Sequence, residues 1–173
     1  MARQLRKFVK KMQATHREQM MPWLGSAHSG SFCLLLDRHL SSTYWAVRPK
    51  PSHETFVAFL TSSFHPTVPK PVTATLAYEL GLEAPAVFSH GDLCPRNIIV
   101  QGGQLVYVTG WDCAGWYPEW WEYVKFFEAR TSDKNFDWYD YANEIFDKEF
   151  HAELAAYQGI GASIVSIQAL AYP

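Results

Sequence analysis

The sequence lacks the features that would assign it to a membrane, secreted or nucleic-acid-binding class. No stretch approaches the roughly 18 uninterrupted apolar residues of a membrane span, and the N-terminus has no apolar signal core. The three cysteines form no Cys-x-x-Cys pair, so a disulfide framework is not expected. Lysine and arginine (15) do not outnumber aspartate and glutamate (17). The net charge of −2 therefore gives no field that would collect nucleic acid. We expect a cytoplasmic protein with no membrane span and no nucleic-acid partner.

What the sequence does contain is the composition of one globular domain. With 173 residues, 48% of them hydrophobic and 18% charged, the chain is long enough for one core and too apolar for a disordered segment. Aromatic residues make up 16% of the chain. Rings of this size carry a large share of the packing energy of a core or an interface.

The first part of the chain is predicted to form helices around one irregular segment. Near the N-terminus, apolar residues recur at helical spacing opposite a basic face, at Leu5, Phe8, Val9 and Met12. Residues 22–51 contain many Gly, Ser and Pro residues, and we predict an irregular segment there. Ser52 is predicted to cap a second helix. A third helix over residues 71–80 is predicted to bury Val72, Leu76 and Leu80.

The second part mixes strands with helices. Two β-like runs, 97–100 and 105–109, flank a Gln-Gly-Gly turn and predict a hairpin. Pro118 is predicted to lie in the first turn of a helix. Two further helices are predicted at about 136–148 and 149–157, ending at glycines.

One loop carries residues suited to phosphoryl transfer. Asp92 and Asn97 follow a predicted strand in the arrangement D-x-x-x-x-N, inside a tight loop that contains Gly91 and Pro95. A carboxylate at this place accepts the proton of an attacking hydroxyl, and an amide oxygen holds a magnesium ion. The spacing therefore predicts an acceptor-activating site.

The residues around this loop resemble a known family. Phe88-Ser-His-Gly-Asp-Leu-Cys-Pro-Arg-Asn-Ile-Ile-Val100, with Trp111 and the run Ala114 to Tyr123, closely resembles the aminoglycoside phosphotransferase and choline kinase-like family, especially its fungal branch. The resemblance implies a protein-kinase-like fold and transfer of the ATP γ-phosphate to a small-molecule hydroxyl. We expect an α+β fold with residues 1–162 as one domain and 163–173 as a tail. This domain would be a mainly helical C-terminal lobe with a small β-hairpin that carries the catalytic loop.

The resemblance assigns roles to individual residues of the loop. Asp92 matches the catalytic base, and Asn97 matches a magnesium ligand that also contacts the nucleotide. His90 matches the histidine that braces the loop and is counted with Asp92 as a catalytic-site residue. ATP and Mg²⁺ are the implied cofactors.

The chain departs from the family at the principal metal ligand. The family has an aspartate immediately before the tryptophan that follows the hairpin, and this chain has Gly110 before Trp111. On a strand, Asp112 would share a face with residue 110 from roughly 6–7 Å further along. Asp112 is therefore the candidate substitute, with Asn97, for binding metal and cofactor, provided that the backbone bends there.

A second departure concerns the nucleotide lobe of the family. Residues 1–89 contain no G-x-G-x-x-G loop and no V-A-I-K-like strand, so we predict that the N-terminal β lobe is absent. With this lobe and a metal ligand missing, a small-molecule kinase with weak or absent turnover is expected. The alternative is a non-catalytic, pseudokinase-like binding module that pairs with another protein chain.

Two other interpretations of single motifs stay open. The aromatic residues Trp116, Tyr117, Trp120 and Trp121 are either contact anchors for a partner or, as we favour, packing residues of the core. His90, Cys94 and Cys113 offer nitrogen and sulfur ligands of the kind that zinc prefers, but no fourth ligand is evident.

Overall fold

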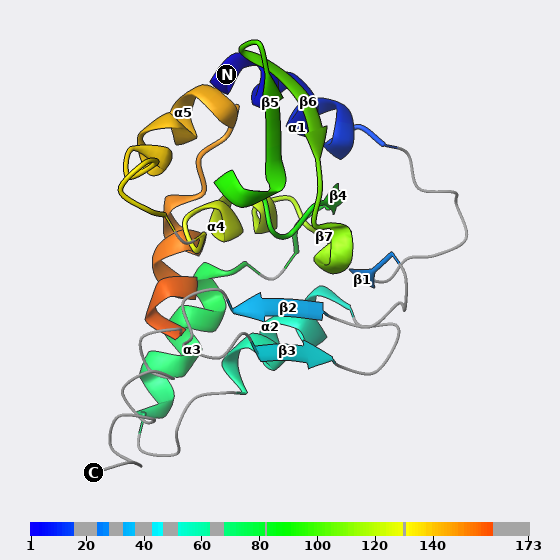
Figure 1. Ribbon diagram of the computed structural model, residues 1–173. Coiled ribbons are helices and arrows are strands. Elements are labelled where there is room, and N and C mark those ends of the chain that lie inside the picture. The colour runs from blue at the N-terminus through cyan, green and yellow to red at the C-terminus, as the bar shows by residue number, and fades with distance from the viewer. Residues whose placement is uncertain are drawn as a thin grey trace.

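The computed structural model places helices and small antiparallel sheets in one α+β arrangement (Figure 1). It describes residues 1–15, 24–27, 33–36, 43–46, 52–62, 68–81, 83–129 and 131–160, with the backbone alone described for 33–36 and 43–46. The predicted α+β class is thereby confirmed at this level. The predicted tail, 163–173, lies outside the described residues.

A three-stranded antiparallel sheet leads the chain into the loop of interest. β7 (Gly115–Pro118) lies between β1 (Gly25–Ser26) and β4 (Ala86–Ser89). Gly115 permits this pairing, because a Cβ there would lie 2.3 Å from a backbone oxygen of β1. The loop that follows β4 is thus held against β7.

Part of the segment predicted to be irregular forms strands. Within residues 22–51, β1 pairs with β7, and β2 (Cys33–Leu36) pairs with β3 (Thr43–Ala46) as an antiparallel hairpin. β-branched and aromatic residues of β3 favour a strand, and the prediction gave too much weight to the neighbouring Gly and Ser residues. The prediction that the N-terminal β lobe is absent depends largely on undescribed parts of residues 16–51, and it stays a prediction.

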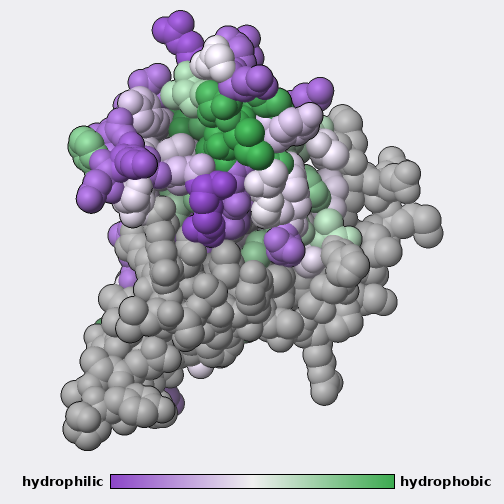
Figure 2. All heavy atoms as spheres, viewed as in Figure 1, coloured by the Kyte–Doolittle hydropathy of each residue, from purple (hydrophilic) through white to green (hydrophobic). Residues whose placement is uncertain are grey.

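The second hairpin forms where it was predicted. β5 (Ile98–Gln101) pairs with β6 (Gln104–Val108) across a turn in which Gly102 and Gly103 both have positive φ. The hairpin exposes the apolar residues Ile99, Val100 and Val106, and Figure 2 shows hydrophobic atoms at the surface of this region. Leu105 and Val108 of β6 pack against the core.

The predicted helices of the first part are present, with one error in burial. α1 (Ala2–Gln13) buries Leu5, Val9 and Met12 as its periodicity requires. α2 (His53–Thr61) is capped by Ser52, whose hydroxyl accepts the Thr55 N–H. α3 (Lys70–Glu79) buries none of its own residues, so the prediction that Val72 is buried was wrong. The core contacts at this end come from Leu76 and Ala77, which are partly buried, and from the predicted Leu80, which is buried directly after the helix.

The helices of the second part differ more from prediction. Pro118 ends β7, and α4 begins later and runs over Trp121–Phe126. In place of one helix over 136–148, the chain forms the short 3-10 helix η3 (Trp138–Tyr141) and α5 (Ala142–Ile145). The last described helix, 151–160, begins later than predicted and includes Gly159. No described helix is long and apolar enough to cross a membrane.

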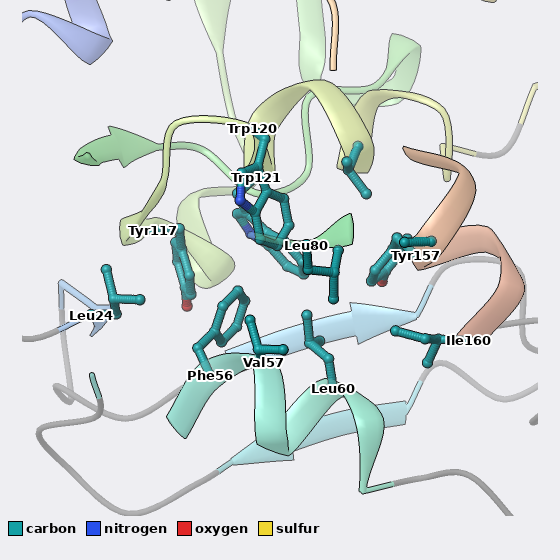
Figure 3. Close-up of a cluster of buried hydrophobic side chains, with 12 residues drawn as sticks. Leu24, Phe56, Val57, Leu60, Leu80, Tyr117, Trp120, Trp121, Tyr157 and Ile160 are labelled. Carbon is teal, nitrogen blue, oxygen red and sulfur yellow. The ribbon is translucent and has the colours of Figure 1, made fainter. Parts of the chain in front are cut away.

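The aromatic run packs into the core between α2, α4 and the last helix (Figure 3). Tyr117, Trp120 and Trp121 are almost fully buried and surround Phe56, with ring centroids 5.1 to 6.0 Å apart. These three rings are therefore packing residues and do not anchor a partner chain. Trp116 is partly exposed and packs edge-on against Phe88 of β4.

Candidate active site

The loop between β4 and β5 is a tight turn that ends in the 3-10 helix η1 (Pro95–Asn97). Gly91 has φ 77°, a left-handed conformation that glycine adopts without strain. A Cβ at Gly91 would also lie 2.9 Å from the Cys113 carbonyl oxygen. Both the turn and its close contact with residues 111–113 thus require this glycine.

His90 braces the loop through both ring nitrogens. Its Nε2 lies 2.8 Å from the Thr109 carbonyl oxygen, which only accepts, so Nε2 is the donor. The other nitrogen, Nδ1, is then free to accept the Asp92 N–H at 3.2 Å. The ring is fully buried and packs edge-on against Trp111 at 4.6 Å. This geometry fits a positioning role more directly than a chemical one.

Glu122 of α4 fixes the buried side of the loop. The sequence analysis did not predict this contact. Its Oε2 accepts the backbone N–H groups of His90 and Gly91, at 2.5 and 3.0 Å. Burial raises the pKa of Glu122 above its ordinary value. Its Oε1 accepts no hydrogen bond within the described part of the chain. A lone carboxylate in the apolar run Trp-Trp-Glu-Tyr-Val was the available signal, because a charged residue is rarely buried without a partner.

Asp92 and Asn97 come together, as predicted, and Arg96 joins them. The Arg96 Nη2 atom lies between the two Asp92 carboxylate oxygens, at 2.8 and 2.9 Å. The Asn97 Nδ2 atom donates to Asp92 Oδ2 at 2.7 Å and to the Asp92 carbonyl oxygen at 2.8 Å. Both oxygens of the carboxylate are therefore hydrogen-bonded to side chains of the same loop.

Gly110 and Asp112 lie in a bend, which departs from the expected strand. β6 ends at Val108, Gly110 has φ 77° and ψ 44°, and residues 111–113 form the 3-10 helix η2 (Trp111–Cys113). Asp112 is exposed on η2, so the relation expected of two residues on one strand does not apply. Its role as a metal or cofactor ligand stays a prediction.

These residues do not fit a magnesium site as they lie. Magnesium binds carboxylate and other oxygen ligands in strict octahedral geometry. Here Gly110 offers no carboxylate, and the hydrogen bond to Asp92 uses only the Asn97 amide nitrogen, so it does not itself block Asn97 Oδ1. Across the described ranges, no cluster of three or more His, Cys, Asp or Glu side chains is placed to hold a metal ion.

The zinc interpretation of His90, Cys94 and Cys113 is not supported either. Both nitrogens of His90 are engaged, one with a carbonyl oxygen and one with a backbone N–H. Cys94 is buried, and burial together with the nearby Asp92 charge raises the pKa of its thiol to about 12. Within the described ranges, these side chains are not placed as a group that could hold a metal ion.

Comparison with known families decides the classification. The phosphotransferase enzyme family matches the chain over residues 1–162. The chain belongs to this family. The predicted resemblance to aminoglycoside phosphotransferases and choline kinase-like enzymes is thereby confirmed. No curated protein and no solved structure gives a match to the chain.

Membership of the phosphotransferase family gives the geometry a context. The family name implies transfer of a phosphoryl group. Family membership covers residues 1–162 as a whole and assigns no role to any single residue.

Proposed function

We propose that this chain is a phosphotransferase-type domain in which Asp92 activates a small-molecule hydroxyl for attack on the γ-phosphate of ATP, and that its turnover is strongly impaired. The observation that carries the proposal is the Asp92 carboxylate, held at a fixed place by a loop that is braced from below by Glu122 and His90. Impairment follows from Gly110, which supplies no carboxylate beside this base.

The proposed reaction uses few groups of the protein. A bond forms between the acceptor oxygen and the γ-phosphorus, the bond from phosphorus to the ADP oxygen breaks, and the hydroxyl proton passes to Asp92. Asp92 Oδ1 accepts from Arg96 Nη2 and, as a carboxylate oxygen, has a second lone pair that can take this proton. Arg96 lies at the open side of the loop, where an acceptor would approach.

The size of the impairment can be bounded. Phosphoryl transfer relies on positioning and charge stabilisation, and losing one preorganised electrostatic group lowers the rate by roughly 10²–10³. The loss of the carboxylate at position 110 belongs to this class. We therefore propose a rate at least this far below the roughly 1–100 s⁻¹ of efficient kinases.

A non-catalytic binding module is the second candidate function. The observation that favours it is the engagement of both Asp92 oxygens by Arg96 and Asn97. A base held in this way can serve a pseudokinase-like protein that binds a small molecule or a second protein chain without turnover.

Release of ADP separates the two candidates. The purified chain is incubated with ATP, Mg²⁺ and a panel of amino alcohols and aminoglycosides, beside Asp92→Asn and the control Asp133→Asn, which changes an exposed aspartate far along the chain. We expect slow ADP release that Asp92→Asn abolishes and Asp133→Asn retains. Equal release in all three proteins rejects the enzyme and favours the binding module. An Asp92-dependent rate within the kinase range rejects the impairment.

A further inference from the structure

The open side of the loop holds the Asp92 carboxylate with protein groups alone. Arg96 brings a full positive charge to within 2.9 Å of both carboxylate oxygens. The Asn97 amide adds hydrogen bonds to the carboxylate and to the carbonyl of the same residue. A carboxylate with this set of donors is both neutralised and fixed in orientation.

Gly110 leaves room for the Asn97 side chain beside Asp92. A Cβ built on Gly110 would lie 2.5 to 2.7 Å from three side-chain atoms of Asn97, namely Nδ2, Cγ and Oδ1. Any side chain at 110 therefore competes with the Asn97 amide for the same space. The neighbour in this clash is the end of a side chain, which can rotate, while the left-handed φ of 77° at Gly110 still strains most other residues there.

We infer that Asp92, Arg96 and Asn97 form a metal-independent latch, in which Arg96 neutralises the Asp92 carboxylate and Gly110 leaves the space that lets Asn97 close it. The inference deepens the proposed function and rests on the role given there to Asp92. It predicts that the shape of this loop is insensitive to Mg²⁺, and that a side chain at 110 releases Asn97 from Asp92.

The latch orients the Asp92 carboxylate and contributes little to the free energy of unfolding. The Arg96 side chain is 43% exposed and that of Asp92 is 13% exposed, so solvent screens their charges. Opening it should therefore leave the fold intact, held by Glu122 and His90 on the buried side. Variants at position 110 are then informative about the loop itself.

Two substitutions at Gly110 test the latch. Gly110→Ala displaces Asn97 without adding a ligand, and Gly110→Asp displaces it and adds a carboxylate, a residue type that tolerates left-handed backbone. The readouts are the side-chain NH₂ signals of Asn97 in ¹H–¹⁵N NMR spectra, the melting temperature with 10 mM MgCl₂ or with EDTA, and Mn²⁺ binding measured by electron paramagnetic resonance. None of these readouts depends on turnover, so failure of the latch is separate from failure of the proposed function.

The expected results differ among the three proteins. In the wild type, the Asn97 signals and the melting temperature are the same in MgCl₂ and EDTA, and Mn²⁺ does not bind. Gly110→Ala moves the Asn97 signals and stays insensitive to metal. Gly110→Asp moves them and gains metal binding, with a melting temperature about 2–4 °C higher in MgCl₂. Unmoved Asn97 signals in both variants, or Mn²⁺ binding by the wild type as tight as that by Gly110→Asp, overturn the inference. If neither variant folds, the wild-type Mn²⁺ measurement decides by itself, since binding at this loop overturns the latch and its absence supports it.

Discussion

The loop between β4 and β5 has a buried side and a solvent-facing, open side, and the two satisfy their polar groups in different ways. On the buried side, backbone N–H groups of His90 and Gly91 donate to one oxygen of Glu122, and the His90 ring donates to a carbonyl. On the open side, side chains bond to one another, with Arg96 and Asn97 both on Asp92. The first set fixes the backbone, and the second fixes a single carboxylate.

This difference separates the contacts that support the fold from the contacts that orient one carboxylate. A buried donor without a partner destabilises the fold by about 1–3 kcal/mol, so changes beneath the loop are severely constrained. An exposed ion pair contributes about 1 kcal/mol or less, so residues on the open side can change while the fold persists. Gly110 lies on the open side, where the loss of a metal ligand leaves the scaffold intact.

The largest effect should come from removing the carboxylate beneath the loop. Glu122→Ala leaves two buried N–H groups without an acceptor and is expected to lower the free energy of unfolding by about 2–5 kcal/mol. Glu122→Gln keeps an acceptor and should lose less than half as much. Urea unfolding measures both, with Glu119→Ala as control, since Glu119 pairs only with exposed Lys148 in the described contacts. A loss for Glu122→Ala no larger than the control would remove the distinction between the two sides.

Gly115 and Gly110 differ in the kind of atom that an added Cβ would contact. At Gly115 this neighbour is the backbone of β1, and at Gly110 it is the side chain of Asn97. Gly115→Ala should therefore destabilise the fold by about 1–3 kcal/mol or more, since the strands must separate. Gly110→Ala should cost less, because Asn97 can rotate. Thermal unfolding of the two variants compares them, and a greater loss for Gly110→Ala would contradict this account.

The pH dependence of stability tests the buried side without breaking it. Burial, acting against the nearby His90 and two N–H donors, raises the pKa of Glu122 in the folded protein. The folded protein then binds the Glu122 proton more tightly than the unfolded protein does. Protonated Glu122 therefore contributes its full stability below the ordinary carboxyl pKa, and this contribution is lost as pH rises through the raised pKa. The stability of the wild type relative to Glu122→Gln should accordingly increase from pH 8 to pH 5. Asp92 also faces Glu122 but is present in both proteins, so their difference isolates Glu122; a difference that is constant with pH would argue against a raised pKa.

The smallest effect is expected on the open side. Arg96→Ala removes an ion pair whose arginine is largely in contact with solvent, and should change the free energy of unfolding by less than about 1 kcal/mol. Urea titration at 50 mM and 500 mM NaCl measures this, and high salt should shrink the difference further. A loss comparable to that of Glu122→Ala would mean that the two sides support the fold equally.

The sequence alone predicted the parts of the site that depend on local spacing. Asp92 and Asn97 fall in one short loop, so their proximity follows from five residues of chain. Likewise, alternation and a Gln-Gly-Gly turn specified the hairpin that follows, and a serine specified the cap of α2.

The sequence could not predict the contacts that depend on tertiary packing. Glu122 lies 32 residues from His90, and only the folded chain brings its carboxylate to the loop. Pro118, the last residue of β7, was predicted to lie in the first turn of a helix because proline favours that position, whereas the pairing of β7 with β4 is not local. Whether the backbone bends at Gly110 was left open, and the folded chain has a left-handed residue there, followed by η2.

The central claim is that Arg96 and Asn97 hold the candidate base Asp92 in a loop that does not bind a divalent ion. Crystals of the wild-type protein grown with MnCl₂ and a non-hydrolysable ATP analogue, measured for anomalous scattering at the manganese edge, test this claim most directly. The account predicts no manganese peak at the loop, with Asn97 and Arg96 still bonded to Asp92. A peak within metal–oxygen bonding distance of Asp92, Asn97 or Asp112 would contradict it.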